Sequence, residues 1–274
     1  MRILVASLPV LAFVCLNAAS AIASDCKGNP NALGVSRVLE VDASQGPLFG
    51  TLQYGKTLDL EPKEVVLTFD DGPHPQNTQR IMAALAKECV QATFFPVGTM
   101  AERYPEILQE LASEGHTIGA HSWSHPNVSR LPQVKAATQI ERGFRAINIA
   151  AEVPIAPFFR FPGLNDSAAM KAYAEKRGFA VFSTDVSSDD WRGISSRTII
   201  RRTMARLRHQ TKGILLFHDT KYATATAVPA LLKALKQGGY KIVHIVPRNN
   251  YSSLENVSVE QATVAGVPTG STPN

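Results

Sequence analysis

Seven short apolar runs, rich in β-branched and aromatic residues, recur along the middle of the chain and predict strands. They cover Val65–Asp70, Ala92–Val97, His116–His121, Pro157–Phe161, Ala180–Asp185, Gly213–His218 and Lys241–Val246. Between most of them the apolar residues recur at helical spacing, over Thr78–Glu88, Ala101–Glu114, Gln133–Ala151, Ser167–Arg177, Arg197–Gln210 and Ala227–Gln237. Repeated strand–helix units of this kind favour an α/β fold with a parallel sheet.

The two ends of the chain depart from this pattern. Residues 1–23 combine a basic start, an apolar stretch and small residues, which predicts a signal peptide. Residues 24–63 lack helical spacing, so we expect an N-terminal extension that is extended or hairpin-like. Residues 249–274 are rich in Ser, Asn, Thr, Gly and Pro, which is typical of a disordered tail. One barrel domain over 64–248 remains between them.

Composition agrees with one exported domain. The chain has 274 residues, of which 45% are hydrophobic and 19% charged, enough for a single large core. After the signal peptide no apolar run approaches the roughly 20 residues of a membrane span, so we expect a periplasmic or extracellular protein without an integral membrane segment. The formal charge of +5 favours an anionic envelope or acidic glycan as partner. No basic tract with interleaved aromatic residues indicates nucleic-acid binding.

Cysteine usage also fits an oxidising compartment. Cys15 lies inside the predicted signal peptide, which leaves Cys26 and Cys89 as an even pair. A disulfide between these two residues is our expectation, with two unrelated free thiols as the alternative.

The first candidate chemistry stands at the end of an apolar strand. The apolar run that begins at Val65 is followed by two adjacent carboxylates, Asp70 and Asp71, and the strand pattern ends at Gly72-Pro73. Neighbouring side chains on a strand point to opposite faces, but at the frayed end of a strand both can reach one cavity. One carboxylate could then bind a metal while the other moves a proton. The alternative is a pair of Asp residues that only start a turn.

Two imidazoles follow about fifty residues later. His121 and His125 are four residues apart, and on a helical turn or a strand-exit loop they can point at a single ion, zinc or a similar divalent metal. Together with Asp71 they would leave coordination positions open, as a catalytic metal site requires. The alternative is that each is an ordinary core or surface histidine.

Three further motifs complete an ordered series. They are Arg160-Phe161-Pro162, the segment from Asp185 to Trp191, and the run from Ile214 to Asp219. With the two motifs above, they resemble the polysaccharide deacetylase family, carbohydrate esterase family 4, which includes the nodulation-type chitooligosaccharide deacetylases. The resemblance spans roughly Val65 to Val246 and implies a distorted, incomplete (β/α)7 barrel.

The resemblance implies a role for each motif residue. Asp70 matches the general base, and Asp71, His121 and His125 match the ligands of a divalent metal, Zn2+ first, with Co2+ or Mn2+ as alternatives. Arg160 matches the residue that pairs with the base, a role that suits a planar guanidinium. His218 matches the general acid, and Asp190 matches the carboxylate that orients it, with Asp185 and Asp189 as alternative candidates.

Three more positions match the substrate pocket. Trp191 and Leu216 match the walls around the acetyl methyl group, with plain core packing as the alternative. Gly163 replaces an aromatic residue of many relatives, so the backbone N–H that holds the oxyanion is kept and an aromatic wall is lost.

The activity implied by the resemblance is removal of acetyl groups from polysaccharides or oligosaccharides that contain N-acetylglucosamine. Acetyl-ester hydrolysis, as in xylan esterases of the family, and an inactive glycan-binding homologue are the alternatives. A phosphoaspartyl hydrolase is disfavoured, because its acids stand as Asp-x-Asp and here they are adjacent. The sequence names neither the glycan nor an oligomeric state.

Overall fold

The computed structural model describes residue 26 and residues 28–252. The predicted signal peptide and most of the predicted tail lie outside the described residues. The strands are β1 (Val35–Val41), β2 (Leu48–Phe49), β3 (Glu64–Asp70), β4 (Thr93–Phe95), β5 (Thr117–Ile118), β6 (Phe158–Phe159), β7 (Ala180–Phe182), β8 (Val186–Ser187), β9 (Gly213–His218) and β10 (Lys241–Pro247). The helices are α1 (Asn77–Lys87), α2 (Gly98–Arg103), α3 (Pro105–Ser113), α4 (Gln133–Ala151), α5 (Ala168–Lys176), α6 (Ser196–Gln210) and α7 (Tyr222–Gln237). Within residues 28–252 we find no helix with the length and hydropathy to cross a membrane.

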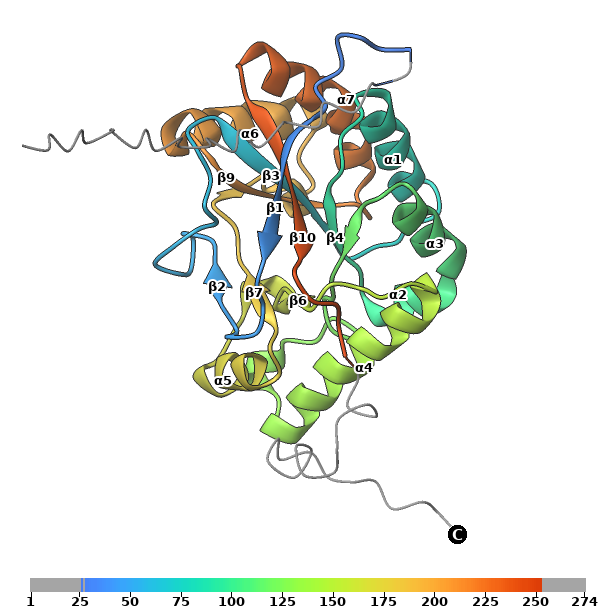
Figure 1. The fold of residues 1–274 in the computed structure, drawn as a ribbon, viewed down its shortest axis with the longest axis vertical. Coiled ribbons are helices and arrows are strands. Elements are labelled where there is room, and N and C mark those ends of the chain that lie inside the picture. The colour runs from blue at the N-terminus through green and yellow to red at the C-terminus, as the bar shows by residue number, and fades with distance from the viewer. Residues whose placement is uncertain (1–25, 27, 253–274) are drawn as a thin grey trace, which may run out of the picture.

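The strands form a distorted, incomplete (β/α)7 barrel, as predicted (Figure 1). Strand β3 pairs in parallel with β9 along one edge, and along the other it pairs with β10 near its start and β4 near its end. From β4 the order continues to β5, and a bridge between Ala120 and Phe159 leads to β6 and then β7. Strand β7 pairs with β2, and only the following strand β8 reaches β9. The ring is therefore interrupted between β7 and β8.

The alternation of side chains along β3 divides the core in two. All seven residues of this strand are buried. Val65, Leu67 and Phe69 belong to the large cluster that packs strands against helices, while Val66 belongs to a second cluster built from strands and loops alone. Because side chains alternate along a strand, Thr68 and Asp70 share the face of Val66 and point into the barrel.

One predicted helix differs in detail, and one open alternative is decided. The helix expected over Ala101–Glu114 is divided into α2 and α3 at Tyr104, because Pro105 removes a backbone donor and suits the first turn of a new helix. In the described part of residues 24–63 the extended alternative holds and the hairpin does not, because β1 pairs in parallel with β10 and β2 pairs in parallel with β7.

The ends of the described chain are tied to the barrel. Cys26 and Cys89 form a disulfide, with their Cα atoms 5.7 Å apart, so the N-terminal segment is fastened to the end of α1. At the other end, Tyr251 stacks on Phe144 of α4, with ring centroids 4.7 Å apart, and its side chain is buried. The first residues beyond β10 therefore pack on the outer helices.

Candidate active site

Asp70 and Arg160 form a buried ion pair at the carboxyl end of β3. The Arg160 guanidinium donates from Nη1 to Asp70 Oδ1 at 2.6 Å, and the two residues are 0% and 2% exposed. Burial raises the pKa of the Asp70 carboxyl above its usual range, and the charge of Arg160 opposes this rise. Arg160 thus holds the Asp70 carboxylate in one orientation. This is the contact that the resemblance implies for Arg160.

The guanidinium is itself fixed on every side. Its remaining donors reach the Thr68 hydroxyl at 2.8 Å, the Phe182 carbonyl at 3.1 Å and the Ser183 carbonyl at 2.9 Å. Its carbon lies 4.4 Å from the centroid of the Phe95 ring. A buried charge with this many partners is stabilised against its desolvation. Thr68 and the two carbonyls belong to no motif, so they could not be predicted as partners of Arg160.

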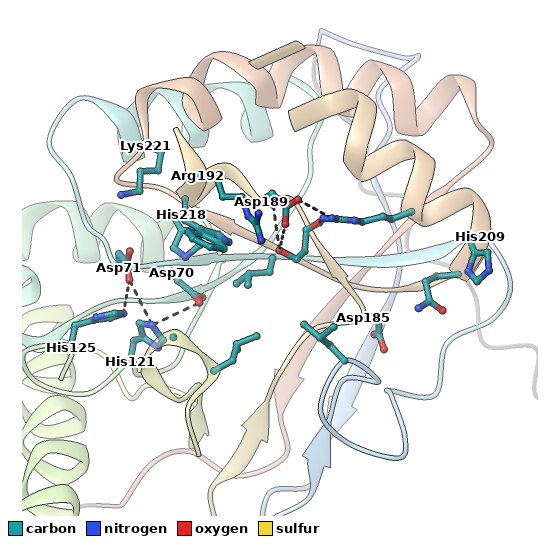
Figure 2. Close-up of a pocket in the computed structure, with 18 residues that line it drawn as sticks. Asp70, Asp71, His121, His125, Asp185, Asp189, Arg192, His209, His218 and Lys221 are labelled. Carbon is teal, nitrogen blue, oxygen red and sulfur yellow. Dashed lines mark hydrogen bonds and ion pairs between the residues drawn. The ribbon is translucent and has the colours of Figure 1, made fainter. Parts of the chain in front are cut away.

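Asp71, His121 and His125 converge on one point beside this pair (Figure 2). Asp71 Oδ1 lies 3.6 Å from His121 Nε2 and 3.4 Å from His125 Nε2. These separations exceed a normal hydrogen bond, and Asp71 Oδ1 is buried without a hydrogen-bond partner. One carboxylate and two imidazoles that face one another in this way fit a shared divalent ion and leave coordination positions open.

His121 is prepared to act as a ligand. Its Nδ1 donates to the Arg160 carbonyl at 2.7 Å, which leaves Nε2 to face Asp71. Burial lowers the pKa of His121 to about 3, so the imidazole is neutral at pH 7. Neutral imidazole with its second nitrogen held by a carbonyl is the form that binds metals.

The loop after β5 positions both imidazoles, so the strand-exit alternative holds and the helical turn does not. Ser122 and His125 adopt positive φ values of 68° and 56°, and the Ser122 hydroxyl accepts a hydrogen bond from the His125 backbone. Helices α2 and α4 approach this loop through two glycines. A Cβ on Gly143 would lie 2.4 Å from the Ser122 carbonyl carbon, and one on Gly98 would lie 2.9 Å from the Trp123 ring.

At the end of β9, the strand next to β3, Asp190 holds His218. Asp190 Oδ1 lies 2.7 Å from His218 Nδ1, and Oδ2 accepts from the His218 backbone N–H at 2.7 Å and from the Thr224 hydroxyl at 2.6 Å. Burial alone would lower the pKa of His218, but the hydrogen bond and charge of Asp190 outweigh it and raise that pKa to about 9. The imidazole therefore carries its proton at neutral pH.

The other two acids proposed for this role lie elsewhere. Asp185 accepts hydrogen bonds from the Thr51 backbone and hydroxyl, from the Thr57 hydroxyl and from the Ile214 backbone, at 2.5–2.8 Å. It thereby fastens the N-terminal extension to the barrel. Asp189 pairs with Arg202 and Arg206, each at 2.8 Å. Only Asp190 of the three contacts His218.

Asp219 explains why glycine follows the two adjacent carboxylates. Its side chain is 1% exposed and accepts a hydrogen bond from the Thr78 hydroxyl at 2.6 Å. A Cβ on Gly72 would lie 2.0 Å from Asp219 Oδ2, so only glycine fits this turn. Burial raises the pKa of Asp219 to about 7. Sequence reasoning assigned this residue no role, although it directly follows His218.

One cleft of about 790 Å³ lies at the carboxyl end of the strands (Figure 2). The lining includes all the predicted metal ligands, Asp70, His218, Gly163, Trp191 and Leu216. Trp191 is 56% exposed, which excludes the core-packing alternative for this residue, whereas Leu216 is 5% exposed. Leu52 from the N-terminal extension and the cations Arg192 and Lys221 also line the cleft, and no motif indicated them.

Comparison with known proteins agrees with this geometry. The family model described as polysaccharide deacetylase matches residues 57–182. A peptidoglycan-N-acetylmuramic acid deacetylase of Bacillus subtilis (strain 168) is 33% identical over 207 residues, which are 75% of this chain and 42% of that protein. A chitooligosaccharide deacetylase of Bradyrhizobium sp. (strain ANU 289) is 28% identical, over 68% of this chain and 90% of the relative.

The solved structure of a peptidoglycan deacetylase from Bdellovibrio bacteriovorus superimposes with a TM-score of 0.73. The two chains are 32% identical, and the match covers 82% of this chain and 63% of that one. This chain thus spans less than half of the Bacillus relative and under two thirds of the Bdellovibrio chain.

Proposed function

Because the chain belongs to the polysaccharide deacetylase family, we propose that it hydrolyses the acetamido group of N-acetylated glycans and releases acetate. One observation carries this proposal: the buried Asp70, the cluster of Asp71, His121 and His125, and His218, which Asp190 holds by a hydrogen bond, all line the same cleft. We also propose, from residues 1–23, that the protein is exported and acts in the periplasm or outside the cell.

The cluster would hold the metal, and Zn2+ is our first choice because it prefers imidazole and carboxylate ligands in sites with open positions. Co2+ and Mn2+ are the alternatives. When bound there, the ion supplies a water molecule of lowered pKa and stabilises negative charge on the acetyl oxygen.

Asp70 is the base that takes a proton from the attacking water. It lies next to Asp71 in sequence, and its Oδ2 faces the His121 side of the cluster at 3.9 Å from Nε2, while its Oδ1 is held by Arg160. One oxygen is thus occupied by the guanidinium and the other is left for the proton. The positioned pair removes the need to reorient the carboxylate during the reaction.

His218 is the acid that protonates the departing nitrogen. An amide leaves poorly unless it departs as an amine, so a group that carries a proton at neutral pH is required. The contact with Asp190 fixes Nδ1 and directs the opposite nitrogen away from Asp190.

Trp191 and Leu216 would border the acetyl methyl group, and the Gly163 backbone N–H would donate to the oxyanion.

Hydrolysis of acetyl esters would use the same groups and is the nearest alternative activity. An inactive glycan-binding protein is a further alternative, but the set of Asp70, Asp71, His121, His125 and His218 is present and gathered at one cleft. A protein that only binds glycans has no use for a buried base and a protonated acid beside a cluster of metal-binding side chains.

Acetate release tests the proposal. Purified protein is incubated with N-acetylated chitin oligomers, with peptidoglycan and with acetylxylan, before and after treatment with a chelator and again after Zn2+ is restored. We expect acetate from at least one of the two acetamido glycans, loss with the chelator and recovery with Zn2+. Asp70→Asn serves as the matched inactive control. Acetate from acetylxylan alone would favour the esterase, and none from any substrate would refute the proposal.

A further inference from the structure

Two cations that line the cleft have no carboxylate partner. The carboxylates that line the cleft face other groups: Asp70 pairs with Arg160, Asp189 pairs with Arg202 and Arg206, Asp185 accepts four hydrogen bonds, and Asp71 faces the two imidazoles of the proposed metal cluster. Across the part of the chain that the structure describes, no carboxylate oxygen lies within 4.0 Å of the charged nitrogens of Arg192 or Lys221. The cleft therefore carries two positive charges that its own acids leave unpaired.

Both cations stand close to the reacting groups. Arg192 follows Asp190 and Trp191 directly, and its guanidinium carbon lies 4.6 Å from the centroid of the Trp191 ring. Lys221 follows His218 by three residues, and its backbone N–H donates to the His218 carbonyl at 3.2 Å. Figure 2 shows both side chains on the His218 side of the cleft. A sugar bound with its acetamido nitrogen at His218 would have substituents within their reach.

No pairing with a carboxylate accounts for either charge. Arg192 contributes to lowering the pKa of Asp189, but that carboxylate already has two arginines at 2.8 Å. Lys221 makes no side-chain hydrogen bond within residues 28–252. Holding two unpaired cations in one partly enclosed cleft is electrostatically unfavourable, and an anionic ligand would relieve it.

We propose that Arg192 and Lys221 bind a carboxylate on the glycan, so that the enzyme prefers acidic glycans, such as those with a lactyl ether next to the acetamido group, over neutral ones. This inference rests on the proposed function. Arg192 supplies planar donors that match a carboxylate, and Lys221 supplies a compact charge. A neutral chitin oligomer offers neither residue a partner. The two residues are specificity determinants, and they take no part in the chemistry of the amide.

The test uses two substrates that differ only in charge. Oligomers of alternating N-acetylglucosamine and N-acetylmuramic acid, free of peptide, are compared with the same oligomers after their lactyl carboxylates have been converted to amides. For each, kcat/KM for acetate release and the dissociation constant by calorimetry are measured at low salt and at physiological salt. We expect the wild type to prefer the carboxylate form by about tenfold or more, the contribution of charge-assisted hydrogen bonds, and to lose part of this preference with salt.

Variants assign the preference to the two residues. In the Arg192→Gln, Lys221→Gln double variant the ratio between the two substrates should fall toward one, mainly through KM. The matched control is Arg201→Gln, Lys233→Gln, which removes the same charge from exposed positions of α6 and α7 outside the cleft lining and should keep the wild-type ratio.

Three outcomes are informative. A wild-type ratio near one, or an unchanged ratio in the double variant, would overturn the inference. An equal fall in the control would assign the preference to net charge and would overturn it as well. Absence of turnover on both oligomers would refute the deacetylase function, while the ratio of dissociation constants would still decide whether the two cations bind the carboxylate.

Discussion

Asp70 and His218 are paired residues in the register of two neighbouring parallel strands, β3 and β9. Adjacent strands are about 4.8 Å apart, and side chains at paired positions leave the sheet on the same side. The backbone ladder thus sets the spacing of the two groups, while Arg160 and Asp190 give them opposite electrostatic surroundings. A carboxylate and a protonated imidazole can coexist side by side in one cleft because each has its own partner.

The adjacent carboxylates should separate into two functions when each is changed. Asp70→Asn should keep the bound metal and lose turnover, because the amide cannot accept the proton. Asp71→Asn should lose metal affinity as well, since Asp71 Oδ1 is the atom that both imidazoles face. Metal content by elemental analysis and acetate release on the same samples give the comparison. Equal metal loss in the two variants, or normal turnover in Asp70→Asn, would contradict the division of roles.

The fall in rate when the general acid is removed should depend on the leaving group of the substrate. In His218→Ala we expect hydrolysis of an acetamido sugar to fall by about 10²–10⁴, the usual contribution of a positioned general acid. An activated aryl acetate, if accepted, needs no protonated leaving group and should lose much less. Initial rates on both substrates decide the point. A similar loss on both would show that His218 acts in binding or oxyanion stabilisation.

The rate should also depend on pH through the same residue. The pKa of His218 is raised to about 9, and the acid must be protonated, so kcat/KM should decline as the pH rises through about 9. In Asp190→Asn the two largest interactions that raise this pKa, the hydrogen bond with the Asp190 carboxylate and its charge, are lost or weakened, while burial, which lowers the pKa, remains and only the smaller effects of Asp70 and Asp71 still oppose it. The alkaline limb should therefore move to lower pH. A pH profile of kcat/KM from 6 to 10 measures the shift, and an unchanged limb would remove Asp190 from this role.

A glycine that is no ligand should control metal affinity. In Gly143→Ala the new Cβ would lie 2.4 Å from the Ser122 carbonyl carbon, and a backbone atom cannot yield without moving the loop that carries His121 and His125. Alanine otherwise favours a helix by about 1 kcal/mol over glycine, so any loss reports the clash. We expect weaker metal binding by competition with a chelator. Gly55→Ala, which meets no atom within 4 Å, is the control and should bind metal normally.

The strands and motif residues could be predicted because each motif follows an apolar run and ends at a turn. Asp70 is the last of the seven buried residues of β3, and Gly213–His218 matches β9 at both ends. The two-residue strands β2 and β8 gave no such signal, since their pairing depends on partners far away in sequence. The parallel pairing of β1 with β10 is likewise a tertiary contact that residues 24–63 do not encode locally.

The partners of the charged residues were the part of the site that could least be predicted from the sequence. Asp185, Asp189 and Asp190 are equivalent as residue types, and only the fold shows that the first binds Thr51 and Thr57 and the third binds His218. Arg192 and Lys221 lacked a motif for the same reason, because an unpaired cation is recognisable only when the partners of its neighbours are known. Sequence supplied the reactive groups, and long-range contacts decided which of them meet.

The hydrogen bonds from the Thr51 and Thr57 hydroxyls to Asp185 have a practical consequence for the choice of a truncated form of this protein. A shortened chain that starts at residue 64 would lose both hydroxyl donors, the Leu52 side of the cleft and the whole of β1. The backbone of β10 from Ile242 to Pro247, now covered by β1, would become an open sheet edge (Figure 1). Such edges recruit other strands and promote aggregation. The smallest part worth expressing therefore begins ahead of Val35.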